Sequence, residues 1–262
     1  MELGLKGKSA LVMASSSGLG KAIGCELARE GAKVMLFSPF EDQLKEAQAD
    51  IEKETGNRPE FFVGSITEPN DIKSLVKKTA ETCGPIYALV NNTGGPKPGT
   101  FDAFSDEDWQ GAYELCLLSY IRTIREALPY MRENGGGRIV CSTSSSVKAV
   151  LDNLILSNTF RMGVMGLAKT LSQELGKDNI LVNVIGPGRI GTARIDQLDQ
   201  IRAEKQGITV EQLQKQTFKN IPLGRYGKPE EYGRLAAFLC SAANTFITGQ
   251  TILLDGGMVK AF

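Results

Sequence analysis

The side chains that most often donate a proton to a carbonyl are absent from a long central stretch of this chain. The sequence contains no histidine, and no tyrosine lies between Tyr130 and Tyr226. Reducing a carbonyl needs a positioned acid, and imidazole and phenol are common donors. The stretch holds a run of hydroxyls at 143–146 and, further along, Ser157 and Arg161. A proton donor in this region would therefore have to be an alcohol or water.

A second chemical signal is a glycine loop followed directly by a helical pattern. The loop reads Met13-Ala14-Ser15-Ser16-Ser17-Gly18-Leu19-Gly20-Lys21. In such a turn, backbone amides and the positive end of a helix can approach a pyrophosphate, and glycine permits the close approach. A G-x-G on its own is a weak signal, so its value depends on the elements around it.

Seven short apolar runs alternate with segments of helical periodicity almost throughout the chain. Their continuity predicts strands that are buried on both faces. The alternation predicts right-handed crossovers and an α/β fold: a Rossmann-like, doubly wound parallel sheet of about seven strands, with helices on both faces, in a single domain over 1–262. Ligands of such sheets bind at the carboxyl ends of the strands. The runs are 9–14, 33–37, 60–63, 87–90, 138–141, 180–185 and 251–254.

Several helix ends can also be read from the sequence. Gly31 is expected to end the first helix as a C-cap. Ser105 and Thr209 are each followed three residues later by an acid or amide, which predicts capped helix starts. Thr209 lies in a polar insertion at about 193–223, which we interpret as a substrate lid. The alternative is a solvated excursion that only covers the sheet.

Composition narrows the class of partner. The chain has 262 residues with 30 basic and 30 acidic side chains, so its formal net charge is zero and a small molecule is a better partner than nucleic acid or a membrane surface. Five widely spaced cysteines predict neither disulfides nor a metal site, and they favour a reducing compartment. No run reaches the roughly 18 apolar residues of a spanning helix, and the expected location is cytoplasmic.

Four further segments stand in order behind the glycine loop. They are 87–94, which ends in Asn91-Asn92-Thr93-Gly94, together with 137–144, 183–192 and 247–257. With the loop, they resemble the short-chain dehydrogenase/reductase family, especially its 3-oxoacyl-carrier-protein-reductase-like members, over nearly the whole chain. The resemblance implies a Rossmann-like fold, a nicotinamide dinucleotide and a homotetramer or homodimer.

The resemblance also bears on the choice of cofactor. After the second strand, the family usually has an acid for NAD or a basic residue for NADP. Here the chain reads Phe37-Ser38-Pro39-Phe40-Glu41, with neither charge at the expected position. Ser38 can hydrogen-bond a 2′-oxygen of either form and the loop serines can assist a phosphate, so the sequence slightly favours NADP over NAD. Phe40 is expected to stack on the adenine or to fill its slot.

Two positions depart from the family pattern in this half of the chain. Ala14 replaces the first loop glycine, at some cost in backbone freedom. Ser65 stands where an Asp commonly contacts adenine. The dinucleotide contacts that the resemblance implies are Ala14, Ser15, Ser16, Ser17, Gly18, Leu19, Gly20, Ser38, Ser65, Ile66, Asn92, Gly94, Arg161, Gly188 and Ile190.

Of the family's four catalytic positions, one is retained. Aligned from Gly137, the family's Ser falls on Ser144, its Tyr on Ser157 and its Lys on Arg161. Counted from Trp109, the family's Asn falls on Cys116. An alcohol is far less acidic than a phenol, so Ser157 cannot be a comparable acid. Arg161 can bind ribose hydroxyls or an anion but cannot act as a base. Cys116 is expected to be a small buried filler, with a weak thiol relay as the alternative.

The cations expected at the carboxyl edge of the sheet suggest an anionic substrate. Acids occur in the same loops, and ordinary mixed surface charge explains the pattern equally well. The cations are Lys97, Lys148, Arg161, Arg189 and Arg194, and the acids are Asp102, Asp152, Asp196 and Asp199.

Two functions fit these observations. The first is an NAD(P)-dependent oxidoreductase that transfers hydride to or from a small carbonyl or quinone-like substrate at a non-standard site formed by Ser144, Arg161 and Ser157. The second is a catalytically silent relative that binds a dinucleotide or another small ligand in a structural or regulatory role, because the joint loss of three catalytic positions is what an idle site would look like.

Overall fold

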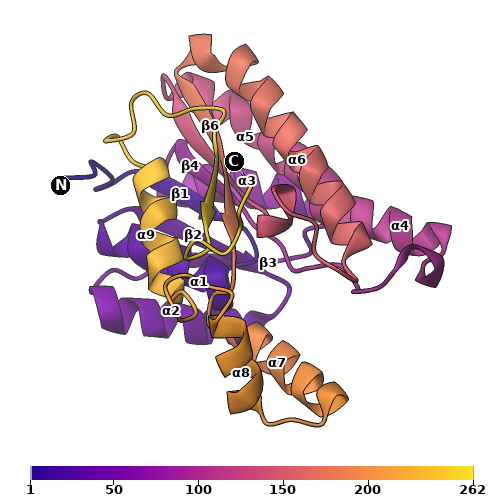
Figure 1. The fold of residues 1–262 in the computed structure, drawn as a ribbon. Coiled ribbons are helices and arrows are strands. Elements are labelled where there is room, and N and C mark those ends of the chain that lie inside the picture. Colours follow the sequence, from indigo (N-terminus) through magenta and orange to yellow (C-terminus); the bar gives the residue numbers. More distant parts are fainter. Residues whose placement is uncertain (1, 262) are drawn as a thin grey trace.

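The apolar runs form one parallel sheet of seven strands in the order β3-β2-β1-β4-β5-β6-β7 (Figure 1). The structure is a computed structural model and describes residues 2–261. The expected Rossmann-like architecture is confirmed. The strands are β1 (Ser9–Val12), β2 (Lys33–Ser38), β3 (Glu60–Val63), β4 (Ile86–Asn91), β5 (Gly137–Ser142), β6 (Ile180–Pro187) and β7 (Thr251–Leu254).

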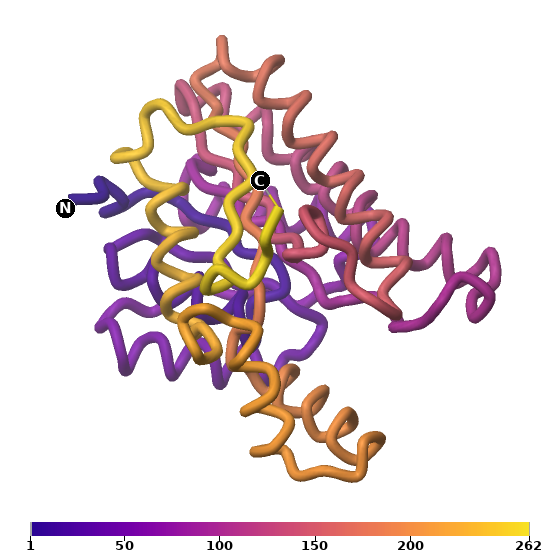
Figure 2. Tube along the Cα trace, viewed as in Figure 1, coloured from indigo at the N-terminus to yellow at the C-terminus, as the bar shows by residue number. Residues whose placement is uncertain are grey.

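Helices cover both faces of the sheet (Figures 1 and 2). One apolar core joins the sheet to α1, α2 and α9, and a second joins its other face to α3, α5 and α6. The helices are α1 (Gly18–Arg29), α2 (Glu41–Thr55), α3 (Pro69–Cys83), α4 (Asp106–Tyr113), α5 (Ser119–Glu133), α6 (Ile155–Glu174), α7 (Ala193–Gln206), α8 (Val210–Phe218) and α9 (Pro229–Leu239), with a π-helical turn at Glu114–Leu118 and short 3-10 turns at Phe101–Ala103, Ser145–Val147 and Gly176–Asp178.

Burial on both faces holds for the central strands and not for the two outer ones. All residues of β1, β4 and β5 are buried, whereas every residue of β7 is half-buried and β3 has exposed ends. The prediction that all seven runs are fully buried was therefore wrong at β3 and β7. Both lie at a sheet edge, where one side has no neighbouring strand.

The predicted helix ends are present. Gly31 follows the end of α1 with a φ of +80°, a conformation that suits glycine. Ser105 and Thr209 form capping boxes at the starts of α4 and α8. The insertion forms α7 and α8, which project away from the body of the molecule (Figure 1).

The five cysteines are free and buried. Within residues 2–261, no helix has both the length and the apolar character that a membrane crossing requires. The same residues contain no group of three or more side chains suited to holding a metal ion. The five cysteine side chains therefore pack as small buried hydrophobes.

We expect the thiols of the native protein to react slowly with thiol reagents. Burial raises the pKa of Cys25 and Cys83 to about 11 and that of Cys141 and Cys240 to about 12, so little thiolate forms near a pH of about 8. Ellman's reagent should therefore label the native protein slowly and all five thiols once the protein is unfolded in guanidinium. Rapid labelling of several thiols in the native state would contradict this burial.

Candidate dinucleotide and substrate site

A cavity of about 570 Å³ lies where the strand order reverses, between the carboxyl ends of β1 and β4. This is the position at which doubly wound sheets bind ligands. Its walls come from the glycine loop, the segments after β2, β3, β4 and β6, and the first turn of α7. The lining residues are Ala14, Ser16–Gly20, Phe37–Phe40, Gln43, Ile66, Asn92–Gly95, Leu115, Pro187, Gly188, Ile190 and Thr192–Ile195.

The glycine loop is held by contacts that leave little room for side chains. Ala14 has a φ of +47°, a region that costs an L-residue about 1–2 kcal/mol. Its carbonyl oxygen accepts a hydrogen bond from Asn92 Nδ2 at 3.2 Å. A Cβ atom on Gly20 would lie 2.2 Å from that same carbonyl oxygen, so α1 can start here only with glycine. The loop therefore presents the amino end of α1 to the cavity, as an anion site requires.

The loop serines have different roles. Ser15 is buried, donates to the carbonyl of Val12 at 2.8 Å and accepts from the amide of Phe37 at 2.9 Å, which fastens the loop to β2. Ser16 lines the cavity and donates to Ser38 at 3.0 Å. Ser15 is thus committed to backbone groups, whereas Ser16 and Ser38 form a neutral hydroxyl pair at the far end of the cavity.

The structure brings most of the expected cofactor residues together. Ser15, Ser65 and Arg161 do not line the cavity; the Ser65 hydroxyl lies 2.9 Å from that of Thr67. The expected residues that do line it are Ala14, Ser16, Ser17, Gly18, Leu19, Gly20, Ser38, Ile66, Asn92, Gly94, Gly188 and Ile190.

Sequence reasoning did not include Gln43, Thr93 and Thr192 among the site residues. Thr93 lies in the loop after β4, Gln43 in the first turn of α2 and Thr192 immediately before α7. Each therefore follows the carboxyl end of a strand in the sequence, and that order was the available signal. Gln43 accepts a hydrogen bond from the Ser16 hydroxyl at 3.2 Å and so extends the neutral cluster at the end of β2.

Arg161 is turned into the protein. Its side chain is buried, with the residue 5% exposed. Nη1 donates to the carbonyl oxygen of Ser142 at 3.0 Å and Nη2 to that of Gly94 at 3.3 Å. This placement differs from the expected contact with ribose or substrate. The guanidinium instead ties the end of β5 to the loop after β4, and that loop forms a cavity wall.

Two phenols lie behind the site. Tyr120 donates to the carbonyl of Ser142 at 2.6 Å, and the Tyr232 hydroxyl lies 2.8 Å from that of Ser142. Both tyrosines are fully buried, neither lines the cavity, and burial raises the pKa of each. They are therefore structural groups, and no phenol occupies the place of the missing family tyrosine among the lining residues.

The two serines of the expected catalytic set remain at this edge of the sheet. Ser144 follows β5, is half-buried and accepts a hydrogen bond from the amide of Ser146 at 3.1 Å. Ser157 is 8% exposed and precedes Arg161 by four residues on α6, so both project from one face of that helix. Cys116 lies inside the π-helical turn with no exposed surface, and burial raises its pKa, which favours the filler role over a thiol relay.

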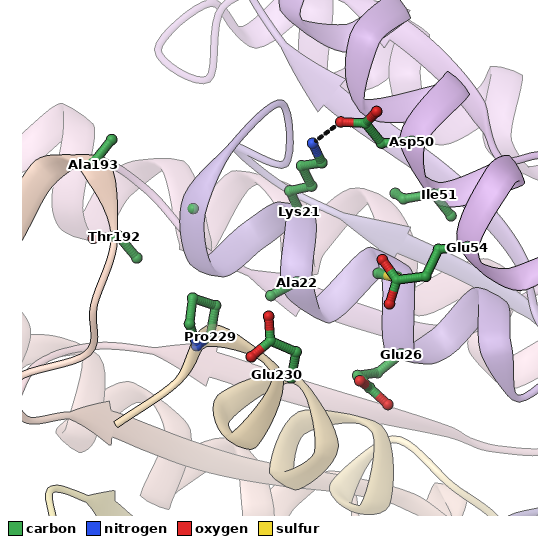
Figure 3. A pocket seen from close by; sticks show the side chains of 12 residues that line it. Lys21, Ala22, Glu26, Asp50, Ile51, Glu54, Thr192, Ala193, Pro229 and Glu230 are labelled. Atoms are coloured by element: carbon green, nitrogen blue, oxygen red, sulfur yellow. Dashed lines mark hydrogen bonds and ion pairs between the residues drawn. The ribbon is translucent and has the colours of Figure 1, made fainter. Parts of the chain in front are cut away.

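A smaller cavity of about 290 Å³ lies between α1, α2 and α9 (Figure 3). Its side chains include Glu26, Asp50, Glu54 and Glu230, and its only lysine, Lys21, forms an ion pair with Asp50 at 2.5 Å. An acid-rich wall repels phosphates, whereas the larger cavity has no acid among its lining residues. Electrostatics therefore favour the larger cavity for a dinucleotide.

Comparisons with known proteins agree over nearly the whole chain. A family model described as enoyl-(acyl carrier protein) reductase matches residues 13–259. The NADPH-dependent reductase BacG of Bacillus subtilis is 31% identical over 97% of this chain and 98% of its own length. The 3-oxoacyl-(acyl-carrier-protein) reductase FabG of Thermotoga maritima is 32% identical over 97% and 99%. The L-sorbose reductase of Gluconobacter frateurii, solved with NADPH and L-sorbose, has a TM-score of 0.95 at 32% identity, covering 100% of both chains.

Gly20→Ala should damage the loop. The new Cβ would meet backbone atoms that cannot move cheaply, so we expect a loss of about 1–3 kcal/mol in the free energy of unfolding and weaker dinucleotide binding. Gly166→Ala on α6 is the matched control, because nothing lies within 4 Å of its Cβ and alanine favours helix by up to about 1 kcal/mol. Urea unfolding of both variants measures the difference; equal stability would argue against the tight turn.

Proposed function

Since the chain belongs to the short-chain dehydrogenase/reductase family, whose 3-oxoacyl-carrier-protein-reductase-like members it resembles throughout, we propose that it transfers hydride between NADPH and a small carbonyl or quinone-like substrate at a site without a phenol. The chain is an NAD(P)-dependent short-chain oxidoreductase. One observation supports the proposed site most strongly: the cavity at the strand-order reversal is lined by the amino end of α1 and by Gly94, whose carbonyl oxygen accepts a hydrogen bond from the buried Arg161.

The residues present fit a dinucleotide. Gly20 packs directly against the carbonyl oxygen of Ala14, with no side chain between them. The backbone amides of the glycine loop would then be able to face a pyrophosphate. Ser16, Ser38 and Gln43 would meet the adenosine ribose with hydroxyl and amide groups, and Phe40, which is 58% exposed, would stack on the adenine. No carboxylate lines this end, so nothing there repels a 2′-phosphate, which supports the preference for NADP.

The proposed chemistry uses polarisation in place of a strong acid. The nicotinamide, when bound, supplies or accepts the hydride. Ser144 and Ser157 donate hydrogen bonds to the substrate oxygen, and the fixed positive charge of Arg161 favours negative charge developing there. A guanidinium cannot give up its proton, so the proton comes from water. Quinone-like or strongly polarised carbonyls suit such a site, because their reduced oxygen is stable before it is protonated.

We also propose the setting in which this reaction takes place. The projecting pair α7 and α8 acts as a substrate lid, because the first turn of α7 already forms part of the cavity wall. The half-buried edge strand β7 and exposed apolar side chains such as Phe101 and Met162 support a homodimer or homotetramer. Five unpaired thiols support a cytoplasmic location.

Titration and turnover test the proposal together. We expect purified protein to bind NADPH more tightly than NADH in fluorescence titrations, and to oxidise NADPH with members of a panel of quinones and activated ketones. Gly20→Ala, with its blocked loop, is the binding control. Tight NADPH binding without turnover of any panel member would instead favour the catalytically silent relative.

Restoring the family residues should create an ordinary ketoreductase. The double variant Ser157→Tyr, Arg161→Lys should reduce simple ketones with NADPH at least about 100-fold faster than the parent, within the range that a positioned general acid contributes. The variant Ser157→Phe, Arg161→Lys is the matched control, because it adds the ring without the hydroxyl. If NADPH still binds and neither variant gains activity, the assignment of these positions is incorrect.

A further inference from the structure

The first turn of α7 places a cation in the cavity. Arg194 lines the cavity, and its Nη2 would lie 3.8 Å from a Cβ built on Gly95, in the loop after β4. The guanidinium thus reaches across the cavity from the insertion to the sheet. No hydrogen bond or ion pair joins this side chain to any other residue that the structure describes.

The charge around Arg194 is not balanced within the cavity. No Asp or Glu occurs among the lining residues, and Arg194 is the one charged side chain there. Two other cations at the carboxyl edge of the sheet form ion pairs outside the cavity. Lys97 pairs with Asp108 at 2.7 Å, and Arg189 lies 3.6 Å from Asp199. Of the two explanations left open by the sequence, an unbalanced cation at the cavity favours anion binding over mixed surface charge.

Arg194 faces the loop after β4 and not the glycine loop. Thr192 is the residue that approaches the loop, with its Cγ2 atom 3.9 Å from a Cβ built on Gly18. Arg194 instead faces Gly95, next to the Gly94 carbonyl that Arg161 binds. A group held by Arg194 would therefore lie toward the proposed catalytic residues and away from the pyrophosphate cradle.

A buried carboxylate holds α7 in this position. Asp199, five residues after Arg194, has no exposed surface; its Oδ2 accepts a hydrogen bond from the Tyr226 hydroxyl at 2.7 Å. Its Oδ1 lies 3.6 Å from Arg189 Nη1. A buried charge is tolerated only with its partners, so Asp199 fixes α7 against the loops that follow β6 and precede α9. Tyr226 is thereby a positioning residue for Arg194.

We propose that Arg194 is a specificity-determining residue that binds a carboxylate on the substrate, so that the physiological substrates are oxo acids or their reduced forms. This inference rests on the proposed function, because it takes the cavity to be the substrate site. An unpaired guanidinium can bind the oxygen atoms of a carboxylate or of a phosphate. The alternative partner of Arg194 is therefore a phosphate group of the dinucleotide.

Matched probes test the proposal by binding. Phenylglyoxylate and its amide, 2-oxo-2-phenylacetamide, differ mainly in charge, and their dissociation constants can be measured by calorimetry with the NADP⁺-saturated protein and with the protein alone. We expect the parent to bind the anion roughly ten- to a hundredfold more tightly than the amide. Arg194→Gln should abolish the difference, and Arg194→Lys should restore part of it. NADP⁺ affinity should change less than about threefold in both.

Tyr226→Phe tests the positioning role. It should reduce the preference for the anion severalfold while leaving the binding of the amide and of NADP⁺ unchanged, a pattern that general destabilisation does not produce. Equal binding of the two probes by the parent, or binding of neither, would overturn the proposal, as would a preference that survives Arg194→Gln. Loss of NADP⁺ affinity in Arg194→Gln with the probe preference intact would assign Arg194 to a cofactor phosphate.

Failure of the proposed function gives a different pattern. In that case the parent would fail to bind NADP⁺ or to turn over the neutral quinones and ketones, whatever the outcome with the charged probe. If the protein without NADP⁺ still bound phenylglyoxylate more tightly than its amide, Arg194 would remain an anion-binding residue.

Discussion

The buried charge of Arg161 constrains this edge of the molecule more than any other interaction. A guanidinium cannot become neutral, so its burial requires hydrogen-bond acceptors in fixed places. The structure supplies the carbonyls of Ser142 and Gly94 and the hydroxyl of Tyr120, from β5, the loop after β4 and α5. The wall of the cavity is therefore held from behind by a permanent charge.

The two ends of the cavity are built on different principles. At the glycine loop, backbone packs against backbone, and the strained Ala14 and the bare Gly20 bring the helix end close to the ligand. On the side of Gly94 and Gly95, Arg194 is the one charged side chain that lines the cavity, and the buried Arg161 holds the Gly94 carbonyl from behind. The first end is the proposed dinucleotide site, and the second is the proposed determinant of substrate choice.

The sequence allowed the parallel sheet of about seven strands to be predicted, because continuous apolar runs and their alternation with helices depend on local pattern alone. It also identified the residues of the glycine loop and the strand ends. The orientation of Arg161 and the backbone role of Ser15 could not be predicted, since each depends on acceptors distant in the chain, such as Gly94 and Phe37. The incomplete burial of β3 and β7 likewise follows from their edge positions.

The absence of acids, histidine and tyrosine from the lining of the cavity has a consequence for acidity. Arg194 is the one ionisable side chain that lines it, and a guanidinium stays protonated throughout the range in which enzymes work. The charge of the lining itself is therefore constant from mildly acidic to mildly alkaline buffer. Any bell-shaped dependence of the rate on pH would therefore arise from the ligand, from water or from groups outside the lining.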